Sequence, residues 1–389
     1  MKEYFMTSIQ SVYIHIPFCQ QICHYCDFTK FFYNEQLAND YIEALKQEIS
    51  TYVQEEQMNV RTIFIGGGTP TALTVQQLET VLSHIAQKFN LDACEEFTIE
   101  ANPGDFSKEK VELLRAYGVN RVSLGVQVFD NEMLKTLGRI HTVKDVYNTV
   151  SLLQNYGIRN ISTDLIYALP NQTVAHFQDS LAKAMDLNLP HLSTYALQIE
   201  PKTVFYQRYK KGQLPRPPQE DEVKMYDILK ATAEENGLHQ YEISNFAKRG
   251  FESKHNLTYW NNDFYYGFGA GAYGYLPGKR YGNIRPLPAY IKQAKKNGKP
   301  VLHVDVIGKK EQIEEEMFLG LRRMAGVSKH QFADKFGLSM DQLYRSSIKE
   351  LMDRGWLMEE EDKVALTEEG KILANEVFER FLLEDTVIH

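Results

Sequence analysis

The alternation of strand-like and helix-like segments over the first two hundred residues is what most constrains the fold of this 389-residue chain. Short β-type runs occupy residues 11–18, 62–67, 96–103, 121–127, 161–169 and 191–200. Helix-type periods lie between them at 39–53, 75–89, 107–117, 143–156 and 174–185. Strands that alternate with helices predict parallel βα units in a curved sheet. The pattern alone does not distinguish an open doubly wound sheet from a barrel.

Polar and glycine signals follow successive predicted strands. A cysteine-rich run follows the first strand, and a Gly-Gly-Gly run follows the second. Asn102 and Pro103 close the third, Gln127 ends the fourth, and Asp164 lies inside the fifth. Because the carboxyl ends of parallel strands meet at one edge of a sheet, we expect these residues to build one shared site.

Cys19, Cys23 and Cys26 form a C-x3-C-x2-C run. Three thiolates can hold three irons of a cubane [4Fe-4S] cluster, which leaves the fourth iron open for a small molecule. A structural zinc site requires a fourth Cys or His ligand at matching spacing. A disulfide framework needs more cysteines than this chain has nearby, since Cys94 is remote in sequence. The spacing favours an iron–sulfur site over zinc and over incidental buried thiols.

Composition and charge narrow the class of protein. No apolar run approaches the ~20 residues that cross a bilayer, and the opening MKEYFMTSIQ lacks a hydrophobic signal region. Cluster-type cysteines point to a reducing compartment, so we expect a soluble, cytoplasmic protein; peripheral membrane association stays open. Residues 311–389 hold 18 acidic against 10 basic residues, whereas residues 1–310 balance at 33 each. Without an excess of positive charge, nucleic acid is not expected as a partner.

The cysteine run, with Tyr25 before its third cysteine, resembles the signature of the radical S-adenosylmethionine (SAM) enzymes. The flanking YIHIPFC and CDF are similar to relatives of oxygen-independent coproporphyrinogen III dehydrogenase. The likeness continues through GGGTPT, EANPGD, GVQVFDNEMLKTLGRIH, STDLIYALPNQT and HLSTYALQIEPKT. It implies an α/β fold, a partial (β/α)6 radical-SAM barrel with its cluster and SAM site in residues 1–240. A connecting segment follows at 241–306.

The last part of the chain, residues 307–389, resembles a winged-helix unit. Helix periods at 311–324, 329–336 and 340–354 precede a short two-stranded wing and a last helix at 371–383. Acidic residues in the wing turn, Glu359 to Asp362, would repel phosphates, so this α-rich C-terminal domain is expected to act as a lid or a docking unit. The aromatic and glycine-rich stretch 258–275 is interpreted as a tightly packed connection; the other interpretation is a surface on which a flat ligand or another chain packs.

The resemblance also assigns the SAM-contacting positions. Backbone groups of the Gly67-Gly68-Thr69 run suit the methionyl ammonium group, and Arg139 suits the carboxylate as a bidentate partner. No residue is given a catalytic role, because cluster and SAM supply the chemistry, the reductive cleavage of SAM. The remaining positions contact the ribose and adenosyl groups or pack around the cluster and adenine: Glu100, Gln127, Asp164, Tyr13 and Tyr25.

Two features separate the branches of this family. The dehydrogenases of porphyrin biosynthesis carry a further Cys where this chain has Phe28, and a longer segment before the first strand. The CDF ending and the run His255-Asn-Leu-Thr-Tyr-Trp260 instead resemble the HemW branch of haem chaperones. In that branch the motif is associated with haem, so His255 is a candidate axial ligand; the other interpretation is a hydrogen-bonded core histidine.

The resemblance therefore predicts a protein that binds haem and hands it to acceptor haemoproteins such as respiratory-chain components. The cluster and SAM would gate that transfer or set a homodimeric state. One alternative is a true coproporphyrinogen III dehydrogenase that works without the missing cysteine. Another is an electron-transfer or scaffold protein that keeps the cluster without using SAM.

Overall fold

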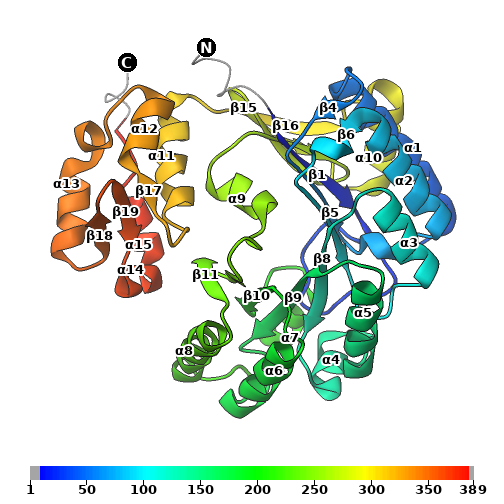
Figure 1. Cartoon of the computed structure of the whole chain (residues 1–389), viewed down its shortest axis with the longest axis horizontal. Coiled ribbons are helices and arrows are strands. Elements are labelled where there is room, and N and C mark those ends of the chain that lie inside the picture. The colour runs from blue at the N-terminus through cyan, green and yellow to red at the C-terminus, as the bar shows by residue number, and fades with distance from the viewer. Residues whose placement is uncertain (1–8, 385–389) are drawn as a thin grey trace.

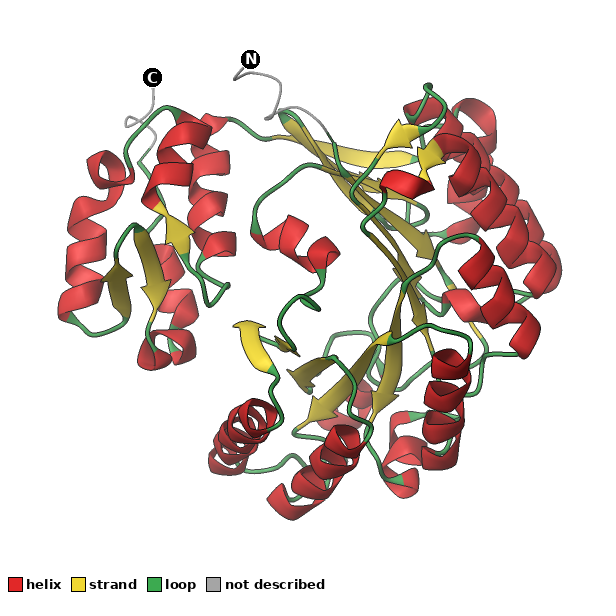
Figure 2. Ribbon diagram, viewed as in Figure 1, coloured by secondary structure: helices red, strands yellow, loops and turns green. Residues whose placement is uncertain are grey.

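The computed structural model describes residues 9–384, and a mixed twelve-stranded sheet runs through most of this part of the chain (Figures 1 and 2). Its strand order is β11-β12-β10-β9-β8-β7-β5-β1-β13-β14-β15-β16. The expectations for residues 1–8 and 385–389 fall outside the described residues. Consecutive neighbours in the central part are parallel: β1 (Ser11–Ile16), β5 (Thr62–Gly67), β7 (Glu96–Ala101), β8 (Arg121–Gln127), β9 (Asn160–Tyr167) and β10 (His191–Ala196).

Helices cover the convex outer face of this curved sheet (Figure 1). Three of them begin at threonine N-caps with capping boxes, at Thr74, Thr142 and Thr173, which satisfy backbone N–H groups of the first turn. Their apolar stripes join the outward-facing side chains of the strands in one core. The helices of this layer are α1 (Glu35–Tyr52), α2 (Val75–Lys88), α3 (Lys108–Ala116), α4 (Asn131–Leu137), α5 (Val143–Asn155), α6 (Val174–Asp186) and α8 (Gln219–Glu235).

The architecture confirms the expected partial (β/α)6 barrel with an α-rich C-terminal domain. The six predicted strands begin within one residue of the observed ones, and the five predicted helices are all present. The predictions ran too long at the carboxyl ends of β1, β7, β9 and β10, where the chain leaves the sheet to form the rim loops. The short elements of the connections were not predicted: β2 (Phe18–Cys19), β3 (Phe31–Phe32), β4 (Met58–Asn59), β6 (Phe89–Asn90), α7 (Val204–Lys210), β11 (His239–Glu242) and β12 (Asn245–Ala247).

The aromatic and glycine-rich stretch extends the sheet beyond β1. After α9 (Lys254–Trp260), strand β13 (Tyr265–Phe268) pairs parallel with β1, and β14 (Tyr273–Leu276), β15 (Lys279–Asn283) and β16 (Val301–Val306) follow antiparallel. Glycine permits this packing, because a Cβ on Gly267 would lie 1.7 Å from the Tyr273 carbonyl oxygen. Helix α10 (Leu287–Asn297) connects β15 to β16. None of these strands was predicted; β13, β14 and β15 each contain glycine, which is depleted in ordinary strands.

The C-terminal domain has its own apolar core and a three-stranded sheet. Its hairpin matches the predicted wing, with Glu361 in a left-handed conformation (φ 53°) at the turn. The predicted single last helix is wrong: it is divided at Leu373, whose φ and ψ of −103° and 24° interrupt the helix. The elements are α11 (Lys309–Gly320), β17 (Val327–Ser328), α12 (Lys329–Phe336), α13 (Met340–Asp353), β18 (Leu357–Glu360), β19 (Lys363–Leu366), α14 (Glu368–Ile372) and α15 (Ala374–Glu379).

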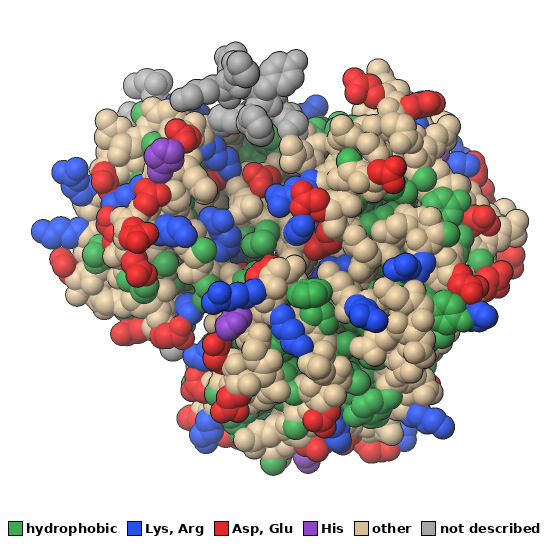
Figure 3. All heavy atoms as spheres, in the orientation of Figure 1, with side chains coloured by type: hydrophobic (Ala, Val, Ile, Leu, Met, Phe, Trp, Pro, Cys, Tyr) green, Lys and Arg blue, Asp and Glu red, His purple; other side chains and the backbone are tan. Residues whose placement is uncertain are grey.

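Specific polar contacts hold this domain against the barrel. The Met324 backbone N donates to the Tyr241 carbonyl at 3.0 Å, and Lys335 Nζ donates to the Asn261 carbonyl at 3.0 Å. Lys230 of α8 pairs with Glu368 of α14 at 3.1 Å. On the face seen in Figure 3, acidic and basic side chains are intermixed over both parts of the molecule. None of the helices within residues 9–384 combines the length and apolar composition needed to span a membrane.

A buried carboxylate joins α1 to the strands beyond β1. Glu48 is fully buried and accepts hydrogen bonds from Gly269 N at 2.9 Å, Asn283 Nδ2 at 2.6 Å and the Tyr290 hydroxyl. Burial raises the pKa of Glu48 to about 7. The Glu48 carboxyl group therefore links α1 to β15 and to α10 through buried hydrogen bonds.

We expect Glu48→Ala to lower the free energy of unfolding by about 3 kcal/mol, because it leaves several buried donors without an acceptor. Urea denaturation followed by circular dichroism measures this change. Glu43→Ala on the same helix is the matched control: its side chain is 58% exposed, so the change should stay below about 0.5 kcal/mol. Equal effects of the two substitutions would contradict the role of Glu48.

Candidate cofactor site

A cavity of about 480 Å³ lies at the carboxyl ends of β5, β7, β8, β9 and β10, as expected for parallel strands. It brings together eleven of the thirteen predicted site residues, from segments up to 145 positions apart. Tyr13 and His255 do not line it. The eleven are Cys19, Cys23, Tyr25, Cys26, Gly67, Gly68, Thr69, Glu100, Gln127, Arg139 and Asp164.

The cysteine-bearing loop is anchored by backbone hydrogen bonds. The Phe31 N donates to the Pro17 carbonyl at 2.7 Å, and the Tyr33 N donates to the Cys19 carbonyl at 2.9 Å, so the loop closes on itself. At its middle, His24 N donates to the Leu137 carbonyl of α4, and His24 accepts from Phe205 N of α7, both at 2.9 Å. The loop is thus fixed between two helices before any cofactor binds.

The thiols are suited to a cluster rather than to a single ion. Burial raises the pKa of Cys19 to about 11 and also raises that of Cys26, so cofactor binding must displace their protons. Among the described residues, no three Cys, His, Asp or Glu side chains converge on a point where one metal ion could bind. A cubane instead takes one thiolate at each of separate iron corners. Gly68 keeps this space open, since a Cβ there would lie 3.0 Å from Cys19 Sγ.

Arg139 supplies a buried positive charge with an unused donor. Its guanidinium donates to Asn102 Oδ1 and, at 2.8 Å, to the Tyr25 hydroxyl. The Arg139 Nε is buried and has no hydrogen-bond partner among the described residues. Because a buried donor without a partner is costly, this atom fits an anionic ligand group such as a carboxylate.

Two carboxyl groups line the cavity on β7 and β9, the two strands that flank β8. Glu100 accepts from Gly67 N at 2.8 Å, and Asp164 accepts from Ser123 Oγ at 3.0 Å and Ser162 Oγ at 2.9 Å. Burial raises the pKa of Asp164 to about 6; burial and repulsion by Asp164 raise that of Glu100 to about 7. These groups favour a ligand that offers hydroxyl or amino donors.

Gln127 lies beside them with an unusual backbone. Its φ is 70°, in the left-handed region, where the register of β8 against β9 shifts between Leu124 and Gln127. A non-glycine residue in this conformation is strained, and such strain concentrates at binding sites. The bulge turns the end of β8 into the cavity.

Asn102, expected at the shared site from its place after the third strand, lines the cavity, but sequence reasoning missed other lining residues, among them Ser123, Tyr195 and Gln198. The two-residue period of a strand could have identified Ser123, because it lies on the same face of β8 as Gly125 and Gln127. The signal in β10 is weaker, since polar residues there continue past the end of the strand.

Tyr13 lies deeper in the barrel than expected. Its hydroxyl lies 2.9 Å from His15 Nδ1, and its ring stacks on Phe64 with centroids 6.1 Å apart. His255 lies on α9, 1% exposed, and stacks on the other side of the same cluster of rings, 5.1 Å from Phe64. The His255 Nδ1 is 2.8 Å from Thr62 Oγ1, and its Nε2 is 2.9 Å from the Tyr259 hydroxyl. Both ring nitrogens therefore have internal partners.

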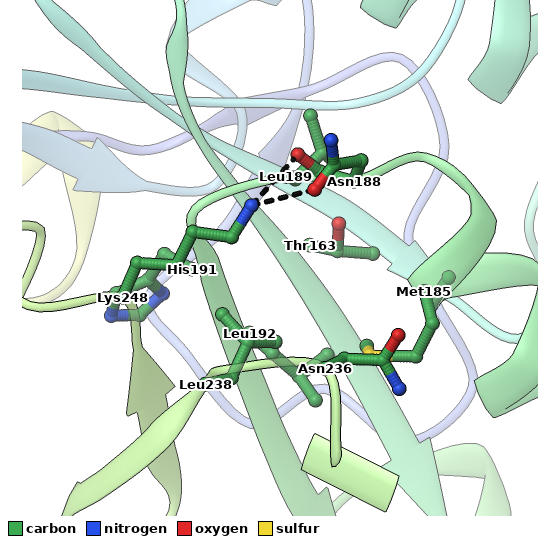
Figure 4. A pocket seen from close by; sticks show the side chains of 10 residues that line it. Thr163, Met185, Asn188, Leu189, His191, Leu192, Asn236, Leu238 and Lys248 are labelled. Atoms are coloured by element: carbon green, nitrogen blue, oxygen red, sulfur yellow. Dashed lines mark hydrogen bonds between the residues drawn. The ribbon is translucent and has the colours of Figure 1, made fainter. Parts of the chain in front are cut away.

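A second cavity is too small for a cofactor (Figure 4). It measures about 20 Å³, enough for roughly one water molecule. The view shows Lys248 reaching across to Asn188, whose Oδ1 accepts from Lys248 Nζ at 2.6 Å. This cavity lies near the amino ends of β9 and β10, away from the cysteine loop.

Family models and relatives place the chain in a known family. Residues 13–184 match the radical SAM superfamily, and residues 307–373 match the HemN C-terminal domain. A protein of Bacillus subtilis (strain 168), named "Heme chaperone HemW", is 49% identical over 97% of this chain and 100% of its own length. The chain belongs to the HemW family. A Lactococcus lactis subsp. lactis (strain IL1403) protein of the same name is 46% identical over 96% of this chain and 98% of its own.

A solved structure supports the HemW-family fold independently. Coproporphyrinogen III oxidase (HemN) from Escherichia coli, described as a radical SAM enzyme, superposes with a TM-score of 0.84 at 22% identity. The match covers 97% of this chain and 90% of that one. The radical SAM family implies a [4Fe-4S] cluster and SAM, and the three thiols, the unpaired Arg139 Nε and the glycine-lined wall fit both.

Removal of the Asp164 charge should lower the pKa of Glu100, because repulsion between the two carboxylates contributes to its raised value. Carboxyl bands in infrared spectra recorded across a pH series of Asp164→Asn measure the change, with Glu100→Gln to identify the band. Asp105→Asn is the control: that acid accepts from Thr71 at 3.1 Å and does not act on Glu100. An unchanged Glu100 titration in Asp164→Asn would disprove the coupling.

Proposed function

We propose that this HemW-family protein binds haem and transfers it to acceptor haemoproteins in the cytoplasm, respiratory-chain components among them. The observation that carries the proposal is the full-length identity of 49% to a protein named as a haem chaperone. Phe28, 66% exposed, stands where the coproporphyrinogen dehydrogenases have a further cysteine, which argues against oxidative decarboxylation. The acidic C-terminal unit, residues 307–389, is the part that we propose as lid or docking surface for acceptors.

The cluster and SAM belong to the same proposal. Cys19, Cys23 and Cys26 would hold the [4Fe-4S] cluster, which supplies an electron for reductive chemistry on SAM when both are bound. Arg139 would bind the SAM carboxylate through its free Nε. Gly67, Gly68 and Thr69 would hold the ammonium group with backbone atoms, and Glu100, Gln127 and Asp164 the adenosyl part. Tyr25 is held against Arg139 and would pack beside the cluster.

The hydrogen bonds around His255 support a role in haem ligation. Thr62 donates its hydroxyl proton to Ser11 Oγ at 2.9 Å, so it can only accept from His255 Nδ1. The proton therefore lies on Nδ1, and Nε2 holds a lone pair that accepts from the Tyr259 hydroxyl. Burial lowers the pKa of His255 to about 3, which keeps the imidazole neutral. A neutral imidazole with its other nitrogen fixed by a hydrogen bond is the form that ligates iron.

In this conformation the Nε2 lone pair faces Tyr259 inside the barrel. Tyr259 lies on the same helix, so haem ligation by His255 requires the last turn of α9 to unwind, which draws the Tyr259 hydroxyl away from Nε2. Helix α9 is held at its start by the Glu96 carboxylate, which accepts from the backbone N of Lys254 at 2.8 Å and of His255 at 3.0 Å. Those bonds can act as the hinge while the far end of the short helix opens.

We expect His255→Ala to abolish the haem Soret band of the reconstituted protein and Tyr259→Phe to strengthen haem binding about fivefold, because it frees Nε2 of one hydrogen bond. Haem titration monitored by absorbance measures both. His239→Ala, a 43% exposed histidine away from α9, is the matched control and should bind as the wild type does. Unchanged haem spectra in His255→Ala would exclude this ligand but not the chaperone function.

The function itself is tested by haem transfer. Haem-loaded protein with a reconstituted cluster should convert an apo-haemoprotein, such as an apo-cytochrome b, to its holo form at a rate that depends on SAM. Cys23→Ala should retain haem but lose the cluster and the SAM dependence. Formation of protoporphyrinogen from coproporphyrinogen III under the same reducing conditions, or absence of haem transfer from the intact protein, would contradict the proposal.

A further inference from the structure

The twelve-stranded sheet ends in an unprotected strand. Strand β16 has a hydrogen-bonded neighbour on the β15 side alone among the described residues. Its side chains are largely exposed: Leu302 is 64%, Val304 53% and Val306 83% accessible. Neither Lys nor Pro, the residues that usually protect an edge, occurs within Val301–Val306. An apolar edge of this kind is a template for another strand.

The two faces of β16 carry different chemistry. Side chains alternate along a strand, so Val304 and Val306 share one face. His303 and Asp305 share the other, where His303 Nε2 lies 3.9 Å from Asp305 Oδ2. The register of β16 against β15 is regular over residues 303–306 and shifts only between Gly282 and Asn283, next to Val301. The exposed edge is therefore regular from His303 to Val306.

Backbone geometry restricts how a second copy of β16 can pair with it. On an edge strand, only every second residue points its N–H and C=O groups outward. Two copies related by a twofold axis can therefore pair only if even-numbered residues lie opposite even-numbered ones and odd-numbered residues opposite odd-numbered ones. The axis then passes beside one residue. An axis at His303 places two histidines opposite each other, and one at Asp305 opposes two carboxylates, which repel.

An axis at Val304 gives complementary pairs at every position. Val304 lies opposite Val304 of the second copy, and each His303 lies opposite an Asp305, which it can pair with by a hydrogen bond or an ion pair. Leu302 lies opposite Val306 at each end. The five residues Leu302-His-Val-Asp-Val306 are thus self-complementary in charge and in apolar character when read antiparallel.

We propose that β16 is a homodimerisation edge, where a second copy of this chain pairs antiparallel about Val304 and joins two twelve-stranded sheets into one. In Figure 1, β16 lies beside β15 at the end of the sheet away from β10 and α8. Pairing there leaves the mouth of the cofactor cavity, at the ends of β5 to β10, open in both copies.

Sedimentation of the full-length protein over a concentration series tests the interface. The wild type should form a dimer, and Val304→Lys should be monomeric, because two ammonium groups would meet at the axis. Val223→Lys, at a 50% exposed valine on α8, is the matched control and should dimerise as the wild type does. A wild type that stays monomeric up to about 100 μM, or a dimeric Val304→Lys, would overturn the proposal.

Charge exchange tests the register. His303→Asp sets two pairs of carboxylates opposite each other and should weaken the dimer at least about tenfold. The double variant His303→Asp/Asp305→His restores opposite partners and should recover most of the loss. A substitution that merely damaged β16 would not be rescued by the second change, and failure of rescue would exclude this register.

Disulfide cross-linking tests the same register by an independent method. Val304→Cys places two Cα atoms about 4.5–5.5 Å apart across the axis, within disulfide reach. Val306→Cys leaves them about 13 Å apart, beyond reach, because each lies opposite Leu302. Mild oxidation should link the first variant and not the second, with the wild type as control for its native cysteines. Equal linkage of both variants would overturn the axis at Val304.

Discussion

The parallel hydrogen-bond ladder around β1 is the constraint on which the rest of the structure depends. On one side β1 pairs with β5 from Ser11 to Ile16, and on the other with β13 from Ser11 to Ile14. These two ladders determine the direction in which β1 points, and so the place where the chain leaves the sheet as the cysteine loop. Because β5 and its neighbours run the same way, glycines, carboxyl groups and Arg139 gather at the same rim. A change in the direction of one strand would carry its polar end to the opposite side of the barrel.

The charged groups at the rim are only partly compensated by other groups of the protein. Glu100 and Asp164 are held by backbone and hydroxyl donors, yet burial raises the pKa of both. Arg139 carries a permanent charge and an unused Nε. Buried charges that lack full solvation are costly in free energy, and they persist where a ligand with complementary groups compensates them. The amino-acid headgroup and hydroxyl groups of SAM, the cofactor that the family implies, would provide this complement.

The two ends of the barrel interior serve different purposes. The carboxyl rim is polar and open, while the region around α9 is a closed set of stacked rings that includes Tyr13, Phe64 and His255. Haem chemistry at His255 would depend on opening this second region, and the hydrogen-bond chain from Thr62 to Tyr259 shows which bond must break. The cofactor cavity needs no such rearrangement, since its loop is anchored to α4 and α7.

The sequence by itself determined the alternation of strands and helices and the cysteine spacing, because local periodicity is a property of neighbouring residues. The resemblance to a known family assigned most of the eleven site residues that lie at the rim. The C-terminal wing followed from local pattern as well. The tertiary structure alone decided where Tyr13 and His255 lie, that four further strands extend the sheet beyond β1, and that β16 remains an edge. These features arise from contacts between residues far apart in the chain, such as β13 against β1 and Glu48 against Gly269, Asn283 and Tyr290. No local propensity encodes such pairings, since each forms only once the chain has folded back on itself.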